Sequence, residues 1–397
     1  MSAGPRVLVV HNRYRVEGGE ERSVALQLAA LAAAGLEHAS FERSSADASR
    51  LGAARALLGG GARPGELADA VRELSGRGRP GAGAPASDGA RVVLHAHNTV
   101  PLIGPAGLAA AQAAGAAVVV NLENVRIFCA TGFGERDGVP CQRCRGRNTL
   151  PGLVLNCRRS LPEAVTYAAA LARHQPRLLE AVDRFVAPSA VARDELVARG
   201  LPADRVGLLG HYLPDEDFAE RSRAGEGRYA LVASRLSPEK GIEDAIEACA
   251  AVGAPLRIAG EGPDRARLEQ LARERDADAA FLGRLSPADV RGELAGAAMV
   301  LMPSRYHEFS PFSALEAVGQ GVPVAATAMG GLPELLGEGR CTPMGATDAF
   351  ADRVAALWDD DDARAAEGEA LLARARERHS RERYTRDLLA LYERVAG

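Results

Sequence analysis

The second half of the chain alternates short apolar runs with segments of helical periodicity. Apolar runs of strand length occupy residues 230–236, 255–260, 279–283, 299–304 and 322–327. The spacing of apolar positions predicts helices near residues 239–252, 263–275, 287–297, 311–320, 332–336 and 347–358. Continuous apolar strands that alternate with helices are typical of a parallel sheet covered on both faces. This half therefore predicts a doubly wound, Rossmann-like α/β domain.

The first half of the chain begins with the same pattern. Strands are predicted at residues 7–10, 37–42, 91–97 and 116–122, and the first helix near 20–34. A further strand–helix–strand series, RFVAPS, AVARDELVARG and RVGLLG, completes this half near residue 211. Residues 51–90 are rich in Ala, Gly and Arg and predict helical fragments followed by a low-complexity connection, to which we assign no chemistry. The first half thus predicts a second parallel sheet.

These patterns divide the chain into domains and a linker. We expect a Rossmann-like domain over residues 1–211, an exposed linker over 212–227, a second Rossmann-like domain over 228–366 and a helical segment over 367–397. An apolar stripe from Tyr384 to Val395 predicts that the terminal helix packs on its own domain. Open α/β sheets bind ligands at the carboxyl ends of their strands, so two facing domains predict a cleft that holds the chemistry.

Composition limits the class of protein. The chain has 397 residues, of which 47% are hydrophobic and 25% charged, as in soluble globular proteins. No run approaches the roughly 20 apolar residues of a membrane span, and the first residues lack the pattern of a signal peptide. A formal charge of -4 gives no overall attraction for nucleic acid. We expect a cytoplasmic protein with no nucleic-acid partner and no transmembrane segment, and peripheral membrane contact stays open.

The single lysine of the chain, Lys240, lies at the start of a predicted helix. Arg235 ends the preceding strand, five positions earlier. A helix N-terminus already favours anions through its N–H groups, so an Arg and a Lys added there suit a diphosphate. Two solvated surface cations are the alternative. Because the other 47 basic residues are all Arg, a position that keeps Lys favours a need for a compact ammonium.

Two carboxylates follow the apolar run at 299–304. Glu308 lies in the loop directly after this strand, and Glu316 lies eight residues later in the next helix. Carboxylates next to an anion site suit the binding of hydroxyl groups, such as those of a sugar ring or a ribose. Surface exposure of both side chains is the alternative.

The predicted start of the helix that carries Glu316 offers backbone N–H groups as hydrogen-bond donors. Ser310 is the expected N-cap, and Pro311 suits the first helical turn. The backbone N–H groups of Phe312 and Ser313 should then point out of the strand end toward an anion.

Four segments of the second half occur together, in the order SRLSPEKG, IAGEGP, MPSRYHEFSPFSALEA and GVPVAATAMGGLPELL. In this order and spacing, residues 228–340 resemble the donor domain of retaining glycosyltransferases of family 4, which have the GT-B fold. The resemblance implies two Rossmann-like domains that face each other across a cleft. It also implies a nucleotide diphosphate sugar as donor, and chemistry that uses neither a catalytic metal nor a protein nucleophile.

The resemblance assigns roles to residues of these motifs. Arg235 and Lys240 bind the donor diphosphate and stabilise its growing charge as it leaves, Glu308 binds hydroxyl groups of the donor sugar, and Glu316 binds the ribose. The other positions implied in donor binding are Gly18, Gly19, Gly260, Ser310, Phe312 and Ser313.

The first half resembles the family through fewer residues. Gly18 and Gly19 occupy the place of the family's glycine pair after the first strand, and an ordinary turn is the alternative. In VLHAHNTVPLIGP we expect His95 and His97 to point to opposite faces of their strand, so that only His97, nearer the strand's carboxyl end, faces the cleft.

Glu123, in NLENVRIFC, stands where the related enzymes carry a His beside the reacting sugar. A buried Glu there would stabilise positive charge at the sugar, or orient a cationic acceptor such as an amino sugar. We place His97, Glu123 and Arg126 on the acceptor side. Glu123 also joins Glu308, Arg235 and Lys240 in the expected catalytic set.

Four of the six cysteines lie in a polar, Gly-rich stretch, at Cys129, Cys141, Cys144 and Cys157. Four thiolates can enclose zinc tetrahedrally and fix a loop that has little core, and a group of reduced structural thiols is the alternative. The same insertion is similar to one found in a subgroup of the family. A structural zinc and the absence of a catalytic metal are therefore the cofactor expectations.

The sequence favours a retaining glycosyltransferase. Its donor is a nucleotide diphosphate sugar, and its acceptor is a hydroxyl or other nucleophile on a small molecule, a lipid carrier or a glycan. The alternatives are a nucleotide-sugar epimerase or hydrolase on the same fold, or a weakly active nucleotide-sugar-binding homologue. A nicotinamide dehydrogenase would need GxGxxG after a strand, which we do not find in the strand-end loops, and a zinc-dependent nucleic-acid reader would need a basic aromatic surface.

Overall fold

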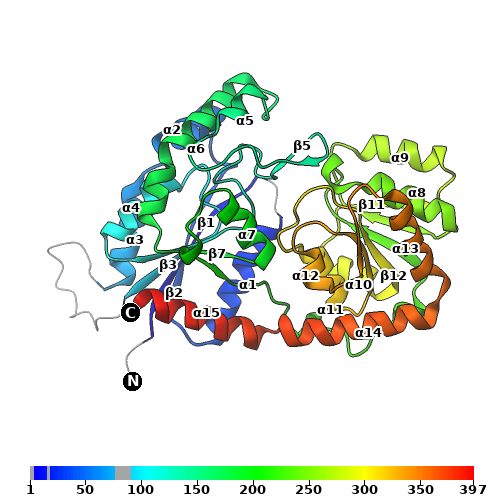
Figure 1. The fold of residues 1–397 in the computed structure, drawn as a ribbon. Helices are drawn as coiled ribbons and strands as arrows, with labels where there is room; N and C mark the ends of the chain where they lie inside the picture. The colour runs from blue at the N-terminus through cyan, green and yellow to red at the C-terminus, as the bar shows by residue number, and fades with distance from the viewer. Residues whose placement is uncertain (1–3, 16–17, 77–90) are drawn as a thin grey trace. The chain divides into compact units, whose positions relative to one another are not determined.

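The computed structural model describes residues 4–15, 18–76 and 91–397, and the chain divides into two compact units (Figure 1). The N-terminal unit comprises Met1–Gly134, Gln142–Gly210 and Glu382–Gly397, and the C-terminal unit comprises Glu135–Cys141 and His211–Arg381. Each unit is built on one six-stranded parallel sheet. The predicted fold class, two Rossmann-like α/β units, is confirmed.

The sheet of the N-terminal unit has the strand order β2-β1-β3-β4-β7-β8. Its strands are β1 Arg6–Arg13, β2 His38–Ser44, β3 Val92–Ala96, β4 Ala117–Asn121, β7 Arg184–Ala187 and β8 Val206–Leu208. Its helices are α1 Gly19–Ala33, α2 Arg50–Gly59, α3 Pro64–Leu74, α4 Gly104–Ala113, α5 Leu150–Val154, α6 Leu161–Ala181, α7 Ala190–Ala198 and α15 Arg381–Ala396. Strands β1 and β3 are neighbours although β2 lies between them in sequence, so the direction of winding reverses there. Such a switch point leaves a crevice at the strands' carboxyl ends.

The sheet of the C-terminal unit has the strand order β11-β10-β9-β12-β13-β14. Its strands are β9 Tyr229–Ala233, β10 Leu256–Ala259, β11 Ala279–Gly283, β12 Ala297–Met302, β13 Val324–Thr327 and β14 Cys341–Thr342. Its helices are α8 Ile242–Val252, α9 Arg265–Glu274, α10 Pro287–Gly296, α11 Phe312–Gly319, α12 Leu332–Leu336, α13 Thr347–Asp359 and α14 Asp361–Arg378. A short hairpin, β5 Glu135–Arg136 and β6 Val139–Pro140, also belongs to this unit. Here the winding reverses between β9 and β12.

Both faces of this second sheet are buried, which explains the continuous apolar strands. Leu231 and Val300 pack into one core with α11 and α14, whereas Val232 and Leu301 pack into the other with α8 and α13. Neighbouring residues of one strand therefore enter opposite cores. The pattern in the sequence follows directly from this arrangement.

The expectation that residues 212–227 form an exposed linker is wrong at the start of this segment. Tyr212 and Leu213 are buried, and Leu213 forms a β-bridge with Ser380 through an N–H bond of 3.0 Å to the carbonyl of His379. The apolar side chains of this segment explain the difference, because they complete the core of the C-terminal unit.

The terminal helix also differs from expectation. Residues Glu382–Gly397 belong to the N-terminal unit rather than to the domain that precedes them in sequence. The fully buried Tyr392 carries this packing, since its hydroxyl lies 2.7 Å from Nε2 of Gln27 and 2.9 Å from Nδ1 of His95. An apolar stripe predicts that a helix is packed but does not specify its partner.

The sequence predicted the helices of the first half only in part. The helical fragments expected after residue 51 are α2 and α3, while residues 77–90 of the low-complexity connection lie outside the described part of the chain. The 21-residue helix α6 was missed, because the cysteine-rich stretch and Pro176 obscured its periodicity.

Candidate functional site

The switch point of the C-terminal sheet gathers the polar residues that the motifs singled out. Arg235 follows β9, and Lys240 ends a short 3-10 turn, Pro238–Lys240, before α8. Glu308 lies in the loop after β12, the strand next to β9. Parallel strands end at the same edge of a sheet, so segments that are about 70 residues apart in sequence meet here.

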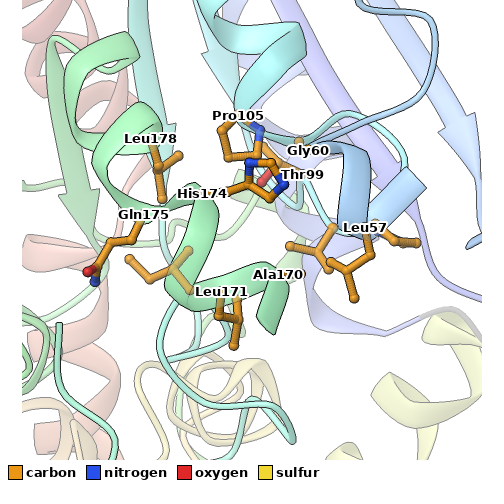
Figure 2. Close-up of a pocket in the computed structure, with 13 residues that line it drawn as sticks. Leu57, Gly60, Thr99, Pro105, Ala170, Leu171, His174, Gln175 and Leu178 are labelled. Carbon is orange, nitrogen blue, oxygen red and sulfur yellow. The ribbon is translucent and has the colours of Figure 1, made fainter. Parts of the chain in front are cut away.

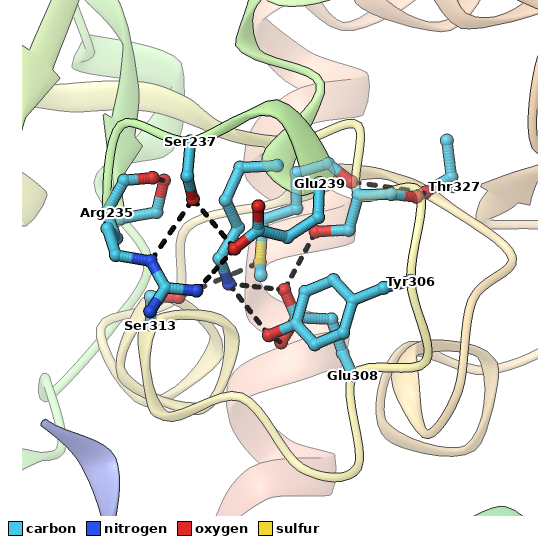
Figure 3. Close-up of polar contacts among 11 residues, drawn as sticks. Arg235, Ser237, Glu239, Tyr306, Glu308, Ser313 and Thr327 are labelled. Atoms are coloured by element: carbon cyan, nitrogen blue, oxygen red, sulfur yellow. Dashed lines mark hydrogen bonds and ion pairs between the residues drawn. The ribbon is translucent and has the colours of Figure 1, made fainter. Parts of the chain in front are cut away.

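Lys240 and Glu308 form an ion pair at this edge (Figure 3). Nζ of Lys240 lies 2.6 Å from Oε1 of Glu308 and 3.1 Å from the hydroxyl of Tyr306. That hydroxyl donates to Oε2 of Glu308 at 2.6 Å, and the hydroxyl of Ser304 donates to Oε1 at 2.8 Å. The Glu308 side chain is 6% exposed and that of Lys240 is 14% exposed. The carboxylate is therefore held by three donors on three different residues.

The pKa values of this cluster follow from burial and from the Glu308 charge. Burial alone would lower the pKa of Lys240, but the adjacent Glu308 carboxylate outweighs it and raises the pKa above the ordinary lysine value. Burial raises the pKa of Tyr306, and Glu308 raises it further. Tyr306 thus stays a neutral donor and Lys240 a cation at neutral pH.

Arg235 lies beside this pair with its side chain 48% exposed (Figure 3). Its guanidinium donates to Oε1 of Glu239 and, at 3.1 Å, to the hydroxyl of Ser237. Burial of Glu239 opposes ionisation, but Arg235 and Ser237 together lower the pKa of this carboxyl below its usual range. Each of the two predicted cations therefore has a carboxylate partner, a feature that the spacing of basic residues did not reveal.

Glycines hold the loops of this site at close range. Gly330 has a φ of +62°, and a Cβ added there would lie 2.1 Å from the carbonyl oxygen of Glu308. The next residue, Gly331, donates its N–H to the same oxygen at 2.6 Å. Gly260 has a φ of +144°, and a Cβ added there would lie only 1.8 Å from the carbonyl oxygen of Ser234. Gly330 thus positions the Glu308 loop, and Gly260 packs the end of β10 against the end of β9.

Helix α11 begins one residue later than the capping pattern suggested. Pro311, with extended backbone, is the N-cap residue and no side chain caps the helix, so the prediction of Ser310 as N-cap is wrong. Proline has no N–H and fixes its own φ, which here leaves Ser310 outside the helix. Phe312 and Ser313 form the first helical positions, whose N–H groups have no acceptor within an α-helix. Glu316 lies on this helix, as the eight-residue spacing predicted, and its side chain is half-buried.

In the N-terminal unit, the switch point between β1 and β3 carries the other predicted residues. Gly18 is the N-cap of α1, and its N–H donates to the Glu21 carboxylate at 2.8 Å. Gly18 and Gly19 are both exposed, and among the described residues beyond its chain neighbours a Cβ at Gly18 would meet the Glu21 side chain alone, at 3.8 Å. The glycine pair thus presents accessible backbone at this edge.

The expectation that His95 and His97 point to opposite faces is wrong. Their rings stack 5.2 Å apart at an angle of 12°, because residues two apart in a strand share a face. Both are buried and both contact Gln27, through Nδ1 of His95 at 2.6 Å and through Nε2 of His97. Burial, followed by the neighbouring His97, lowers the pKa of His95 well below its ordinary value. His95 and Gln27 therefore hold His97 in place.

Glu123 follows β4 and lies close to His97, as the acceptor-side grouping required. Its Oε1 is 3.8 Å from Nδ1 of His97 and accepts from Nδ2 of Asn121 at 3.0 Å. The Asn121 amide also lies 3.3 Å from Nδ1 of His97, so one side chain links the two. Arg126 is half-buried, with its guanidinium 5.3 Å from the centre of the Tyr14 ring.

Glu20 is a member of this cluster that the sequence did not single out. It accepts from Nδ2 of Asn124, and burial followed by the nearby Glu123 raises the pKa of Glu20 to about 8, while Arg126 opposes the rise. The glycine pair immediately before it was the available signal. Two carboxylates and one guanidinium thus share this edge of the N-terminal sheet.

We expect the Glu20→Gln variant to be stabilised relative to the wild type as pH rises. The folded-state pKa of this carboxyl lies above its unfolded value of 4.5, so the folded protein holds a proton that the unfolded chain releases. Stability is thus lost from about pH 4.5 up to about pH 8, at up to about 1.4 kcal/mol per pH unit. Thermal unfolding of both proteins at pH 5 and pH 8.5 should give a larger gain at pH 8.5. Glu73→Gln, at an exposed carboxylate of α3, is the control, and equal gains at both pH values would contradict the assignment.

An apolar pocket opens in the same unit among α2, α4 and α6 (Figure 2). Its empty space, open solvent included, is about 460 Å³. Leu57, Leu171 and Leu178 line it, and Thr99 and Ile127 bring it next to the loops that follow β3 and β4. Such a lining suits hydrocarbon better than a charged group.

The four clustered cysteines do not form a metal-binding group. Cys141 belongs to the C-terminal unit, whereas Cys129, Cys144 and Cys157 belong to the N-terminal unit. In the described ranges of the chain, no three or more His, Cys, Asp or Glu side chains are grouped so as to hold a metal ion. The described residues thus do not bring the four cysteines together as a zinc site, and the expected structural zinc is not confirmed.

Both units together define a protein of the GT-B fold. Over 98% of this chain and 99% of the other, the structure is similar to a sucrose-phosphate synthase from Thermosynechococcus elongatus, with a TM-score of 0.68 and 16% identity. A structure of Anabaena Alr3699/HepE in complex with UDP is similar over the same shares, with a TM-score of 0.66 and 15% identity.

A family match lies in the C-terminal half of the chain. Residues 214–372 match the family described as Glycosyl transferases group 1. All of Arg235, Lys240, Glu308 and Glu316 lie inside the matched range.

Curated relatives match over part of the chain. A sulfoquinovosyl transferase from Arabidopsis thaliana is 32% identical over 176 residues, which are 41% of this chain and 34% of that protein. A GDP-mannose-dependent monoacylated phosphatidylinositol monomannoside mannosyltransferase from Corynebacterium glutamicum is 34% identical over 173 residues, which are 40% of this chain and 45% of that protein. The chain thus spans a third to a half of the length of these relatives.

Proposed function

We propose that the protein is a retaining glycosyltransferase that takes its sugar from a nucleotide diphosphate sugar and needs no catalytic metal. The observation that carries the proposal is the grouping of Arg235, Lys240 and Glu308 at the switch point of a sheet whose residues match a glycosyltransferase family. UDP is the ligand of one structural neighbour and GDP-mannose the donor named for one relative, which supports a nucleotide donor without specifying the base.

In this proposal the cations act on the leaving group. As the bond between the anomeric carbon and the diphosphate oxygen breaks, negative charge grows on the diphosphate, and Lys240 and Arg235 stabilise it. Because Glu308 and Glu239 already neutralise these cations in part, the N–H groups at the start of α11 supply further positive potential. The acceptor oxygen forms the new bond on the face that the leaving group vacates, and its proton passes to the departing diphosphate.

Glu308 is the proposed contact for the sugar. Its carboxylate already accepts hydrogen bonds from Ser304, Tyr306 and Lys240, so its position is fixed before the donor arrives. A donor hydroxyl can use a remaining lone pair, since a carboxylate offers about four acceptor sites.

The acceptor is proposed to bind the N-terminal unit at the β1/β3 switch point, beside His97, Glu123 and Arg126. The acidic pair Glu20 and Glu123 supports an acceptor that brings a hydrogen-bond donor or a positive charge. The Asn121 link supports His97 and Glu123 acting together.

Donor screening tests the proposal directly. Nucleotide diphosphate sugars are added one at a time and the thermal midpoint is measured, because a ligand that binds the folded state raises it. The best donor is then incubated with candidate acceptors, and NMR of the product gives the anomeric configuration. An α-linked donor should give an α-linked product. Free sugar released equally with and without acceptors would indicate a hydrolase instead.

We expect the two carboxylates to separate in binding experiments. Glu316→Ala should weaken binding of the nucleoside diphosphate by about tenfold or more, the cost of one charge-assisted hydrogen bond. Glu308→Gln should leave that binding nearly unchanged but lower turnover with the sugar donor at saturation. Calorimetry with the nucleoside diphosphate and initial rates with the full donor make the comparison. The opposite pattern would show that the two roles are exchanged.

A further inference from the structure

Exposed apolar side chains gather on one group of helices in the N-terminal unit. Among the described residues, eight large apolar side chains are exposed, and six of them lie on α2, α5 and α6. These six are Leu51, Leu58, Leu150, Val154, Leu161 and Val165. Val154 is 73% exposed, the largest value among them. Isolated exposed leucines are ordinary, but a concentration on neighbouring helices is not.

The spacing of these residues puts them on continuous helix faces. On α6, positions four apart are all exposed or half-exposed and run Leu161, Val165, Ala169, Arg173 and Arg177. This stripe is apolar in its first half and cationic in its second. On α5, Leu150 and Val154 are also four apart, and α6 packs against both α5 and α2 (Figure 1). Because the two helices contact each other, we treat their exposed residues together and name them the α5–α6 surface.

The charge around the α5–α6 surface is opposite in sign to that of the whole chain. Residues 142–178 contain several arginines and one acidic residue, Glu163, which pairs with Arg158 at 2.7 Å. The other arginines of this stretch, all at least partly exposed, are Arg143, Arg145, Arg147, Arg159, Arg173 and Arg177. The formal charge of the whole chain is -4. The positive charge is therefore local.

We propose that the α5–α6 surface docks on a lipid bilayer that carries anionic headgroups. Aliphatic side chains gain free energy when they enter the boundary between headgroups and hydrocarbon, and arginines around them pair with lipid phosphates. The apolar pocket also lies along α6, where Ala170, Leu171 and Leu178 line it. In the described part of the chain, no helix is long and apolar enough to span a membrane. The contact proposed is thus peripheral.

Charge and composition favour a bilayer over the other occupants of such a surface. In a twofold-symmetric dimer the same patch meets itself, which would bring the arginines of both copies into one interface. Single-stranded nucleic acid is held by aromatic stacking, whereas the exposed apolar residues of this surface are Leu and Val. An anionic bilayer satisfies both the aliphatic and the cationic parts at once.

Vesicle sedimentation tests the proposal, without donor or acceptor, so its outcome is independent of the proposed transferase activity. The full-length protein is spun with vesicles of phosphatidylcholine alone or of an equal mixture with phosphatidylglycerol. We expect binding to the mixed vesicles, little binding to pure phosphatidylcholine, and a decrease as salt screens the arginines.

Matched variants locate the contact. Val154→Glu combined with Val165→Glu should lower the partition coefficient on mixed vesicles by at least about tenfold, since two aliphatic side chains that would enter the bilayer are replaced by anions. Arg173→Ala combined with Arg177→Ala should lower it by about thirtyfold, at about 1 kcal/mol per arginine. Leu208→Glu, at an exposed leucine on β8 of the same unit, should bind like the wild type. Circular dichroism melting checks that each variant is folded.

Three results would overturn the proposal. The first is the absence of binding of the wild type to anionic vesicles. The second is equal binding by the Val154/Val165 variant and by Leu208→Glu. The third is a wild-type dimer in sedimentation velocity that the Val154/Val165 variant converts to monomer, because the surface would then be an interface between two copies.

Discussion

Replacing Lys240 with methionine should reduce sugar transfer by about a hundredfold or more and also destabilise the C-terminal unit. The loss of rate is that expected when one preorganised charge at a leaving group is removed. The loss of stability has a separate cause, because Glu308 would keep a buried carboxylate without its cation. Breaking a buried ion pair on one side costs about 3 kcal/mol or more. Initial rates and urea unfolding measure the two effects.

A double variant separates the two effects. In Lys240→Met with Glu308→Gln the charge is removed from both partners, so we expect much of the lost stability to return while sugar transfer stays low. Lys240→Arg keeps the charge but replaces a compact ammonium by a planar fork, in a site where Tyr306 and Glu308 already contact the nitrogen. It should retain stability better than activity. Full transfer by Lys240→Met with its best donor would remove the assignment.

Replacing Gly330 with alanine should disrupt the same site without touching its charges. The residue has a φ of +62°, and the new Cβ would lie 2.1 Å from the carbonyl oxygen and 2.6 Å from the nitrogen of Glu308. Backbone atoms cannot move aside as a flexible side chain can, so the loop that carries Glu308 must shift. We expect a decrease of more than about 3 kcal/mol in the free energy of unfolding, together with a loss of donor binding.

Gly345→Ala is the matched control for this prediction. Gly345 lies in the same unit with a φ of +79°, but a Cβ added there would have none of the described residues beyond its chain neighbours within 4 Å. It carries the conformational strain without the collision, and should cost about 1 kcal/mol with donor binding unchanged. Urea unfolding and calorimetry compare the two. Equal losses in both variants would mean that strain, rather than displacement of Glu308, sets the effect.

The fold could be predicted from the sequence because its strands are buried on both faces. Val232, Leu301 and their neighbours must be apolar at every position, and this leaves a continuous pattern that alternates with helices. The packing partner of α15 left no such trace, since its stripe would suit either unit. Long-range packing of Tyr392 on Gln27 depends on shape rather than on periodicity.

The candidate sites were predicted unevenly, for a related reason. Arg235, Lys240 and Glu308 could be singled out because the carboxyl ends of parallel strands lie at the same edge of a sheet. Residues that follow these strands, or that begin the next helix, therefore lie near one another. Their carboxylate and hydroxyl partners, Glu239 and Tyr306, are set by side-chain geometry within loops, which has no period. The stacking of His95 on His97 was predictable, because a spacing of two in a strand places both rings on one face.

The return of residues 382–397 to the N-terminal unit determines how the protein can be cut into parts. A fragment that ends at Gly210 lacks Tyr392 and leaves Gln27 and His95 without the hydroxyl that they share. An independent N-terminal fragment therefore needs Gly210 joined to Glu382. Leu213 and Ser380 are paired in a parallel β-bridge, so Gly210 and Glu382 leave it in opposite directions, and the connecting peptide must span the distance between them. In terms of domain architecture, residues 211–381 are an insertion into the N-terminal unit.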